Sequence, residues 1–205
     1  MKSPRILFAV ACLVLAAVIG GVTLLNLNTA HSLDPRAIST GKALIGGPFQ
    51  LVDQNGKAVD QGLLKGKWSA VFFGYTFCPD VCPTTLQTLA AAQDKLGTKA
   101  KDLQVVFVSI DPARDTPKQL KAYLSSKDFP AGTIGLTGTN AQVAAAAKVY
   151  RIYYAKHGSG SDYTMDHSSV TYLMDPKGEF VAALPYNLSP DQEADQIRSA
   201  MEKSS

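Results

Sequence analysis

Two cysteines, Cys78 and Cys82, are the residues of this chain best suited to chemistry. They follow an apolar run at residues 71–73 and precede a helix-like pattern that begins at Pro83. A turn between a strand and a helix exposes side chains on a rigid scaffold. Thiolates at such a turn bind soft metal ions or attack disulfides, and the two sulfurs can also form a structural disulfide. The position of the pair leaves all three possibilities open.

The spacing of the cysteines bears on each possibility. Three residues separate Cys78 from Cys82, whereas a thioredoxin-type redox motif has two. In a helical turn, positions four apart share one face, so both sulfurs can point at one ion. Pro83 fits the first helical position with Cys82 as the cap, and a helix N-terminus favours the thiolate. A structural disulfide here would close only a small loop and add little stability.

His167, which lies just before a predicted strand at residues 170–174, is the candidate for a third ligand. Two thiolates and one imidazole form a soft, low-coordinate donor set that suits Cu(I), whereas zinc would want a fourth ligand. Asp111 and Asp166 could hydrogen-bond the ligands. His157, by contrast, sits among glycines and serines and is interpreted as a histidine of a flexible loop.

A charged segment at residues 110–117 is the third marked feature. Thr116 and Pro117 predict a helix start, with Thr116 as the cap. Arg114 and Asp115 fit a charged loop that pairs with charges elsewhere in the chain. They fit equally well a loop that shapes the site or presents a surface to a partner.

The elements that must position these residues alternate between strands and helices. The predicted strands are 48–51 and 57–59 (a hairpin), 68–75, 103–110, 133–137, and 170–174 with 179–184 (a second hairpin); the predicted helices are 83–96, one from 116, 140–150 and one from 189. This order predicts an α/β domain with a thioredoxin-like fold, in which helices flank a mixed central sheet that carries an extra N-terminal β-hairpin. In such a sheet, His167 would lie beside the cysteine turn.

The charge balance excludes one class of partner. The chain has 205 residues, with 20 Lys and Arg against 17 Asp and Glu. Lys2 and Arg5 are the only charges before Asp34, and without them 18 basic residues face 17 acidic ones. A nearly neutral domain without a basic face does not indicate nucleic-acid binding.

The N-terminal segment predicts a membrane anchor. Residues 6–25 carry no charge and would span roughly 30 Å as a helix, about one hydrocarbon core. The basic residues that precede them predict a cytoplasmic N-terminus and an exported remainder. We therefore expect a single transmembrane helix within an anchor at 1–25, a linker at 26–43 and a copper-binding domain at 44–205. A cleaved signal peptide is the alternative.

Four segments together resemble the Sco/SenC family, the membrane-anchored copper-binding assembly factors for cytochrome c oxidase. The segments are residues 73–83, 108–117, 135–139 and 162–169, in the expected order. Their joint match is highly specific, whereas two cysteines with three residues between them would be a weak signal alone.

The resemblance implies a copper site, for Cu(I), Cu(II) or both, whose cysteines map onto Cys78 and Cys82 and whose histidine maps onto His167. It implies a membrane-tethered metallochaperone rather than an enzyme. This metallochaperone would take copper from a periplasmic donor and help to assemble the CuA centre of cytochrome c oxidase subunit II. The alternative is a thiol-disulfide reductase that keeps the acceptor's cysteines reduced. The expected location is the inner membrane of a bacterium, with the domain in the oxidising periplasm.

Two related families fit less well. Thioredoxins carry a cis-proline beside the active site where this chain has Ser169, which argues against ordinary oxidoreductase geometry. Peroxiredoxins carry a proline and a threonine before their cysteine, and this chain has Val71 and Tyr75 at those positions. We therefore discount peroxidase activity.

Overall fold

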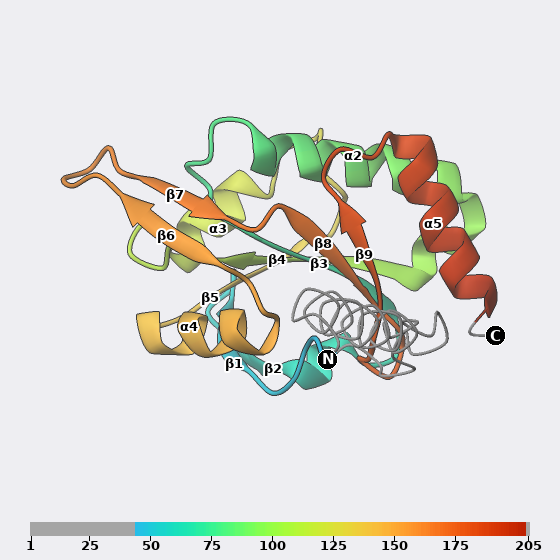
Figure 1. Cartoon of the computed structure of the whole chain (residues 1–205), viewed down its shortest axis with the longest axis horizontal. Helices are drawn as coiled ribbons and strands as arrows, with labels where there is room; N and C mark the ends of the chain where they lie inside the picture. The colour runs from blue at the N-terminus through green and yellow to red at the C-terminus, as the bar shows by residue number, and fades with distance from the viewer. Residues whose placement is uncertain (1–43, 204–205) are drawn as a thin grey trace, which may run out of the picture. The chain divides into compact units, whose positions relative to one another are not determined.

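The computed structural model describes residues 44–203, in which helices cover both faces of a seven-stranded sheet (Figure 1). The strand order is β2-β1-β5-β4-β3-β8-β9. The strands are β1 (Gln50–Asp53), β2 (Ala58–Asp60), β3 (Trp68–Gly74), β4 (Leu103–Ser109), β5 (Ile134–Thr137), β8 (Val170–Met174) and β9 (Phe180–Pro185). The helices are α2 (Val81–Leu96), α3 (Pro117–Tyr123), α4 (Asn140–Val149) and α5 (Pro190–Lys203).

The sheet is mixed, as predicted. Strands β3, β4 and β5 run parallel, and β8 pairs antiparallel with β3. The N-terminal hairpin of β1 and β2 joins the edge of β5 in the antiparallel sense. This arrangement confirms the thioredoxin-like α/β fold with its additional hairpin.

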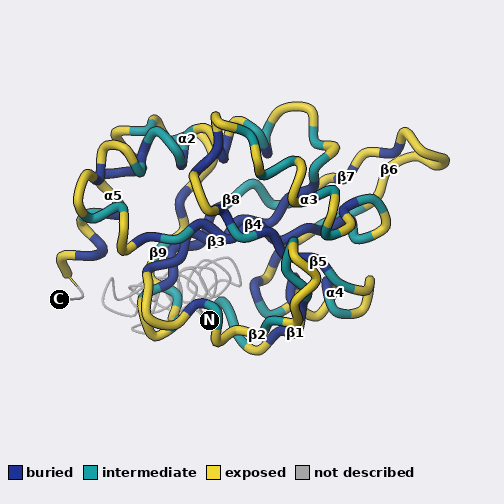
Figure 2. The backbone as a smooth tube through the Cα atoms, turned by 180° about the vertical axis from the view of Figure 1, so that it is seen from behind, coloured by how far each residue is buried: buried dark blue, intermediate teal, exposed yellow. Residues whose placement is uncertain are grey.

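Strands β3 and β4 form the centre of the core. Every residue of β3 is buried, and the two strands pair in register, with Phe72 opposite Phe107. Figure 2 shows both strands almost entirely buried. A strand that is covered on both faces needs an uninterrupted run of apolar residues, which both strands have. Their C-terminal ends therefore form a rigid base for the turns that follow.

The helices pack on opposite faces of this base. Helices α2 and α5 lie together on one face, while α4 lies against the hairpin of β1 and β2 on the other (Figures 1 and 2). Helix α5 turns Ala194, Ile197 and Met201 inward, at the helical spacing of an amphipathic face. Helix α2 follows β3 after the turn at residues 75–80, so its first turn stands near the strand's C-terminal end.

The start of helix α2 differs from the prediction. It begins at Val81 with Asp80 as the N-cap, so Cys82 is the second helical residue and not the cap. Pro83 consequently occupies the third position. The first-turn N–H groups have no partner within a helix, so a proline costs no hydrogen bond at any of these positions, and the proline alone could not fix the helix start.

The other helix starts follow ordinary capping rules. Thr116 caps α3 as predicted, and its side chain accepts a hydrogen bond from the N–H of Gln119. Helix α4 begins at Asn140, and its cap is Thr139, which forms a reciprocal capping box with Gln142. These caps fix the ends of the loops that follow β4 and β5.

A separate two-stranded ribbon carries the candidate histidine. It pairs β6 (Tyr154–His157) with β7 (Thr164–His167) and extends away from the central sheet (Figure 1). Neither strand was predicted. The assignment of His157 to a flexible loop is wrong, because it lies in β6 and its Nε2 is 2.8 Å from Oδ2 of Asp166. The glycines and serines that suggested a loop occupy the tip of the ribbon instead.

The predictions for the N-terminal segment concern residues outside the described range. The anchor at 1–25 and the linker at 26–43 both fall entirely outside it, since the description begins at Leu44. Among residues 44–203, no helix combines the length and the apolar character that a membrane crossing requires.

Candidate metal centre

Cys78, Cys82 and His167 converge on one point. Their ligand atoms all lie within 4.8 Å of one another. The Nε2 atom of His167 is 3.5 Å from the Sγ atom of Cys82, across 85 residues of sequence. Cys78 comes from the turn after β3, Cys82 from the first turn of α2, and His167 from the end of β7. The structure thus brings together all three predicted ligands.

The two cysteine thiols differ in pKa, so that Cys78 is charged and Cys82 is neutral. The backbone N–H of Cys82 donates a hydrogen bond to Sγ of Cys78 at 3.5 Å, so the first sulfur accepts from the helix N-terminus. The pKa of Cys78 falls from 9.0 to about 3, chiefly because the Cys82 thiol hydrogen-bonds to it, while burial opposes the change. The pKa of Cys82 is raised, first by burial and then by the neighbouring Cys78.

The protonation pattern of the pair matters for metal binding. Cys78 is half-buried and offers a thiolate in the metal-free protein, whereas Cys82 is buried and holds its proton. A metal ion that takes both sulfurs must displace the proton of Cys82. Because both cysteines are free thiols, the sulfurs are available to such an ion.

His167 is oriented for binding by its other ring nitrogen. Its Nδ1 lies 3.0 Å from the backbone carbonyl oxygen of Ser168, which can only accept a hydrogen bond. Nδ1 therefore carries a proton, and Nε2 is the ring nitrogen that faces the sulfurs. Phe72 and Tyr75 contact the ring edge-on, each with a centroid separation of 6.0 Å. This apolar packing holds the plane of the imidazole.

The two carboxylates expected to support the ligands have other partners. Asp166 precedes His167 on β7, so its side chain points to the opposite face of the ribbon, where it pairs with His157. Asp111 is buried and binds Arg114 and the hydroxyl of Tyr163. A backbone carbonyl orients His167 in their place, and sequence cannot reveal such a contact.

Gly74 is a further residue of the centre, beyond the two cysteines and the histidine. A Cβ atom at this position would lie 2.7 Å from Sγ of Cys82 and 3.0 Å from the Phe107 ring. The absence of a side chain at the end of β3 therefore makes room for the buried sulfur. A glycine at the end of an apolar strand is the signal that marks such a close approach.

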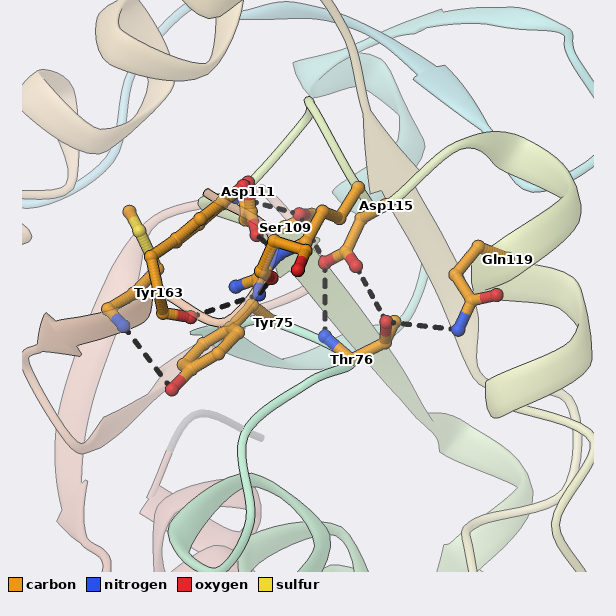
Figure 3. A network of polar contacts seen from close by, with 10 residues as sticks. Tyr75, Thr76, Ser109, Asp111, Asp115, Gln119 and Tyr163 are labelled. Carbon is orange, nitrogen blue, oxygen red and sulfur yellow. Dashed lines mark hydrogen bonds and ion pairs between the residues drawn. The ribbon is translucent and has the colours of Figure 1, made fainter. Parts of the chain in front are cut away.

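The loop between β4 and α3 (residues 110–116) borders the centre through a polar network (Figure 3). Arg114 pairs within the loop, with Asp111. Asp115 is fully buried and accepts hydrogen bonds from Thr76 and Ser109. Burial raises the pKa of Asp115 despite these hydrogen bonds. Of the two interpretations of this segment, the structure therefore favours a loop that shapes the site.

The donor set of the centre favours a soft metal ion. Two sulfurs and one imidazole suit Cu(I), and a three-ligand set leaves a coordination position for an incoming ligand. Cys78 and His167 are half-buried and mark the accessible side, while Cys82 closes the inner side. The arrangement can therefore hold an ion firmly and still admit a donor or an acceptor from the surface.

Comparisons with known proteins identify the family to which this chain is similar. The SCO1/SenC family model matches residues 37–202. The chain is 45% identical over 161 residues to the mitochondrial SCO1 homolog 1 of Arabidopsis thaliana, covering 78% of this chain and 48% of that protein. The chain spans about half the length of this and the yeast mitochondrial relatives.

Solved structures share the fold. The structure of Bradyrhizobium japonicum ScoI with copper bound is 44% identical, has a TM-score of 0.69, and covers 76% of this chain and 99% of its own. BsSco, described as a member of the Sco family of cytochrome c oxidase assembly proteins with a disulfide switch, is 27% identical with a TM-score of 0.61, covering 75% and 91%. The family match over most of the chain, on a fold that assembles the cysteines and the histidine, shows that this chain belongs to the SCO1/SenC family.

Proposed function

We propose that this protein is a copper metallochaperone that binds one copper ion through Cys78, Cys82 and His167. The observation that carries the proposal is the convergence of two sulfurs and one imidazole nitrogen within 4.8 Å. The thiolate of Cys78 and the Nε2 atom of His167 both face the ion's position, and the proton of Cys82 leaves when the ion binds. The copper-bound structure of a relative at 44% identity supports the choice of metal.

The physiological role we propose is the assembly of cytochrome c oxidase. The acceptor is the CuA site of subunit II, whose cysteines would take the ion by ligand exchange at the exposed side of the centre. A periplasmic copper donor would load the protein at the same side. The description of BsSco as belonging to a family of cytochrome c oxidase assembly proteins supports this role.

We favour copper binding over thiol-disulfide reduction because it uses all three residues. A reductase needs only the two sulfurs and leaves His167 without a function. Yet the imidazole lies 3.5 Å from Cys82, with its orientation fixed by Ser168. The replacement of the thioredoxin cis-proline by Ser169 supports the same choice.

The proposed setting is the bacterial inner membrane. Residues 1–25 would anchor the chain, residues 26–43 would act as a tether, and the copper domain would face the periplasm. An anchor confines the domain near a membrane-bound acceptor and raises its effective concentration. A C-terminal alkaline phosphatase fusion tests the orientation, because this enzyme is active only after export; an inactive, stable fusion would contradict the proposal.

Deletion of the gene tests the role. We expect the deletion strain to lose cytochrome c oxidase activity at limiting copper and to recover part of it when copper is added. Full-length wild type should restore activity, while the Cys78→Ser variant should not. Normal oxidase activity in the deletion strain at limiting copper would refute the role in assembly.

A further inference from the structure

The metal centre is assembled from two separate sheets. The cysteines stand at the C-terminal end of β3 in the central sheet, whereas His167 ends the ribbon of β6 and β7. A ligand set of this kind keeps its geometry only if the two parts are held at a fixed separation. The β4–α3 loop (residues 110–116) contacts both parts, and its side chains form the network in Figure 3.

Resting on the copper-binding function proposed above, we propose that the β4–α3 loop is the positioning element of the metal centre. Asp115 fixes the cysteine turn through Thr76, and Arg114 fixes the histidine ribbon through Tyr163. The loop thereby sets the distance between the sulfurs and the imidazole.

Asp115 holds the turn that leads to the cysteines. Its Oδ1 accepts a hydrogen bond from the hydroxyl of Thr76 at 2.6 Å, and its Oδ2 accepts one from the backbone N–H of Thr76 at 3.1 Å. Oδ2 also accepts the hydroxyl of Ser109, at the end of β4, at 2.6 Å. A fully buried carboxylate depends on such bonds, so it tolerates little displacement of its donors. Thr76 is two residues before Cys78, so this clamp fixes where the turn begins.

Arg114 holds the ribbon at the residue that precedes β7. Its Nη1 donates to the backbone carbonyl of Tyr163 at 3.0 Å, and its guanidinium lies 3.6 Å from the centroid of the Tyr163 ring. The hydroxyl of Tyr163 donates to Asp111 at 2.6 Å, and Asp111 in turn pairs with Arg114. The backbone, the ring and the hydroxyl of one ribbon residue are therefore all tied to the loop.

The contacts of Asp115 with Thr76 form the cysteine clamp, and the contacts of Arg114 with Tyr163 form the ribbon clamp. The two clamps are connected through the loop. The backbone N–H of Asp115 donates to the carbonyl of Asp111 at 2.9 Å, and the N–H of Asp111 donates to the Ser109 hydroxyl at 3.0 Å. Arg114 also stacks over Phe77 in the cysteine turn, with 4.6 Å to the ring centroid. A shift of the ribbon is thus opposed by the same short loop that holds the cysteines.

A double-mutant cycle between Arg114 and His167 tests the ribbon clamp. Cu(I) affinity of the full-length protein is measured by competition with a chromogenic chelator, for Arg114→Gln, His167→Ala and the double variant. We expect Arg114→Gln to weaken binding about tenfold, comparable to losing a group that orients a ligand. In the His167→Ala background the same change should cost less than about twofold, because residues that act through one another are not additive.

The cycle separates the two proposals. If Arg114→Gln lowers Cu(I) affinity by the same factor in both backgrounds, the ribbon clamp is overturned, while the proposed copper-binding function still stands. Unchanged affinity in His167→Ala alone would instead overturn the proposed ligand set. If circular dichroism shows that Arg114→Gln does not fold, Tyr163→Phe replaces it, since this change removes only the hydroxyl bond to Asp111; it should show a smaller loss with the same dependence on His167.

A pair of variants at Thr76 tests the cysteine clamp. Thr76→Val removes the hydroxyl that donates a hydrogen bond to Asp115, and Thr76→Ser retains it. We expect Thr76→Val to weaken Cu(I) binding about tenfold in both His167 backgrounds and to shift the Cu(II)–thiolate absorption band, while Thr76→Ser behaves as wild type. Thr88→Val is the matched control, because the Thr88 hydroxyl donates to a carbonyl within α2. A Thr76→Val protein with wild-type affinity and spectrum would overturn this clamp.

Discussion

The Nε2 atom of His167 faces the Sγ atom of Cys82 at 3.5 Å. The Ser168 carbonyl sets the direction of the imidazole, and Phe72 and Tyr75 hold its plane. A third ligand that is already in place reduces the ordering cost that binding must offset. The centre therefore resembles a preorganised receptor for a small cation more than a pair of reactive thiols.

Gly74→Ala should damage the centre directly. The added Cβ would stand 2.7 Å from Sγ of Cys82, so the sulfur or the strand must move. We expect a loss of about 1–3 kcal/mol in the free energy of unfolding, typical of overpacking, together with at least about tenfold weaker Cu(I) binding. Urea denaturation and chelator competition measure the two effects.

Gly135→Ala is the matched control for this change. It also adds a methyl group to a buried strand residue, where the Cβ would meet Leu124 at 2.5 Å, but on β5 rather than beside the sulfurs. It should lower stability without changing Cu(I) affinity. Equal losses of affinity in the two alanine variants would show that Gly74 acts only through general stability.

Cys78 should react as a thiolate in mildly acidic solution. Its pKa falls from 9.0 to about 3, chiefly through the hydrogen bond with Cys82. In the reduced, metal-free protein we expect iodoacetamide to label Cys78 at pH 6 almost as fast as at pH 8. An ordinary thiol would be about 80-fold slower at the lower pH. Mass spectrometry after timed quenching gives both rates.

The Cys82→Ala variant removes the cause of this shift. Without the Cys82 thiol, the pKa of Cys78 should move back toward its ordinary value, and labelling at pH 6 should slow markedly. The same experiment should leave Cys82 of the wild type unlabelled, because this residue is fully buried with a raised pKa. Labelling of Cys78 that rises with pH as in a free cysteine would contradict the assignment of the charge.

Glu193 should make folding stability depend on pH. This residue of α5 is 3% exposed, and burial raises its pKa from 4.5 to about 7. The folded state therefore binds the proton more tightly than the unfolded state. Its contribution to stability is full below pH 4.5 and is lost as the pH rises through 7, by at most about 3 kcal/mol. Urea denaturation at pH 5 and pH 8 measures the fall.

Glu193→Gln should flatten this profile, because the amide does not titrate. Glu202→Gln is the control: Glu202 is exposed, and its pKa is lowered by Lys99 rather than raised. We expect the control to retain the loss of stability between pH 5 and pH 8. A fall of unchanged size in Glu193→Gln would assign the pH dependence to other groups.

The central sheet and the candidate ligands could be predicted from the sequence for identifiable physical reasons. The apolar runs of β3 and β4 are long and uninterrupted, which is the pattern of strands buried on both faces. The order of elements then placed His167 beside the cysteine turn, and the structure brings their ligand atoms together. These features depend on local pattern and on topology, both of which are present in the chain itself.

The ribbon and the helix start depend on contacts that local pattern does not contain. Strands β6 and β7 have few buried residues and a tip rich in glycine and serine, so they lack the alternation of a half-buried strand. The role of Ser168 is played by its backbone carbonyl, which every residue has. Asp166 and Asp111 were expected to hydrogen-bond the ligands because they are acidic residues near them. Their side chains point to other partners, His157 and Tyr163.

The most direct test compares two histidines of the same ribbon. His167 faces the sulfurs, whereas His157 pairs with Asp166 on the other face. We expect His167→Ala to weaken Cu(I) binding of the full-length, reduced protein at least about 100-fold, since loss of a ligand should exceed the effect of losing an orienting group. His157→Ala should bind as wild type. Equal Cu(I) affinities of wild type and His167→Ala would contradict the three-ligand copper centre.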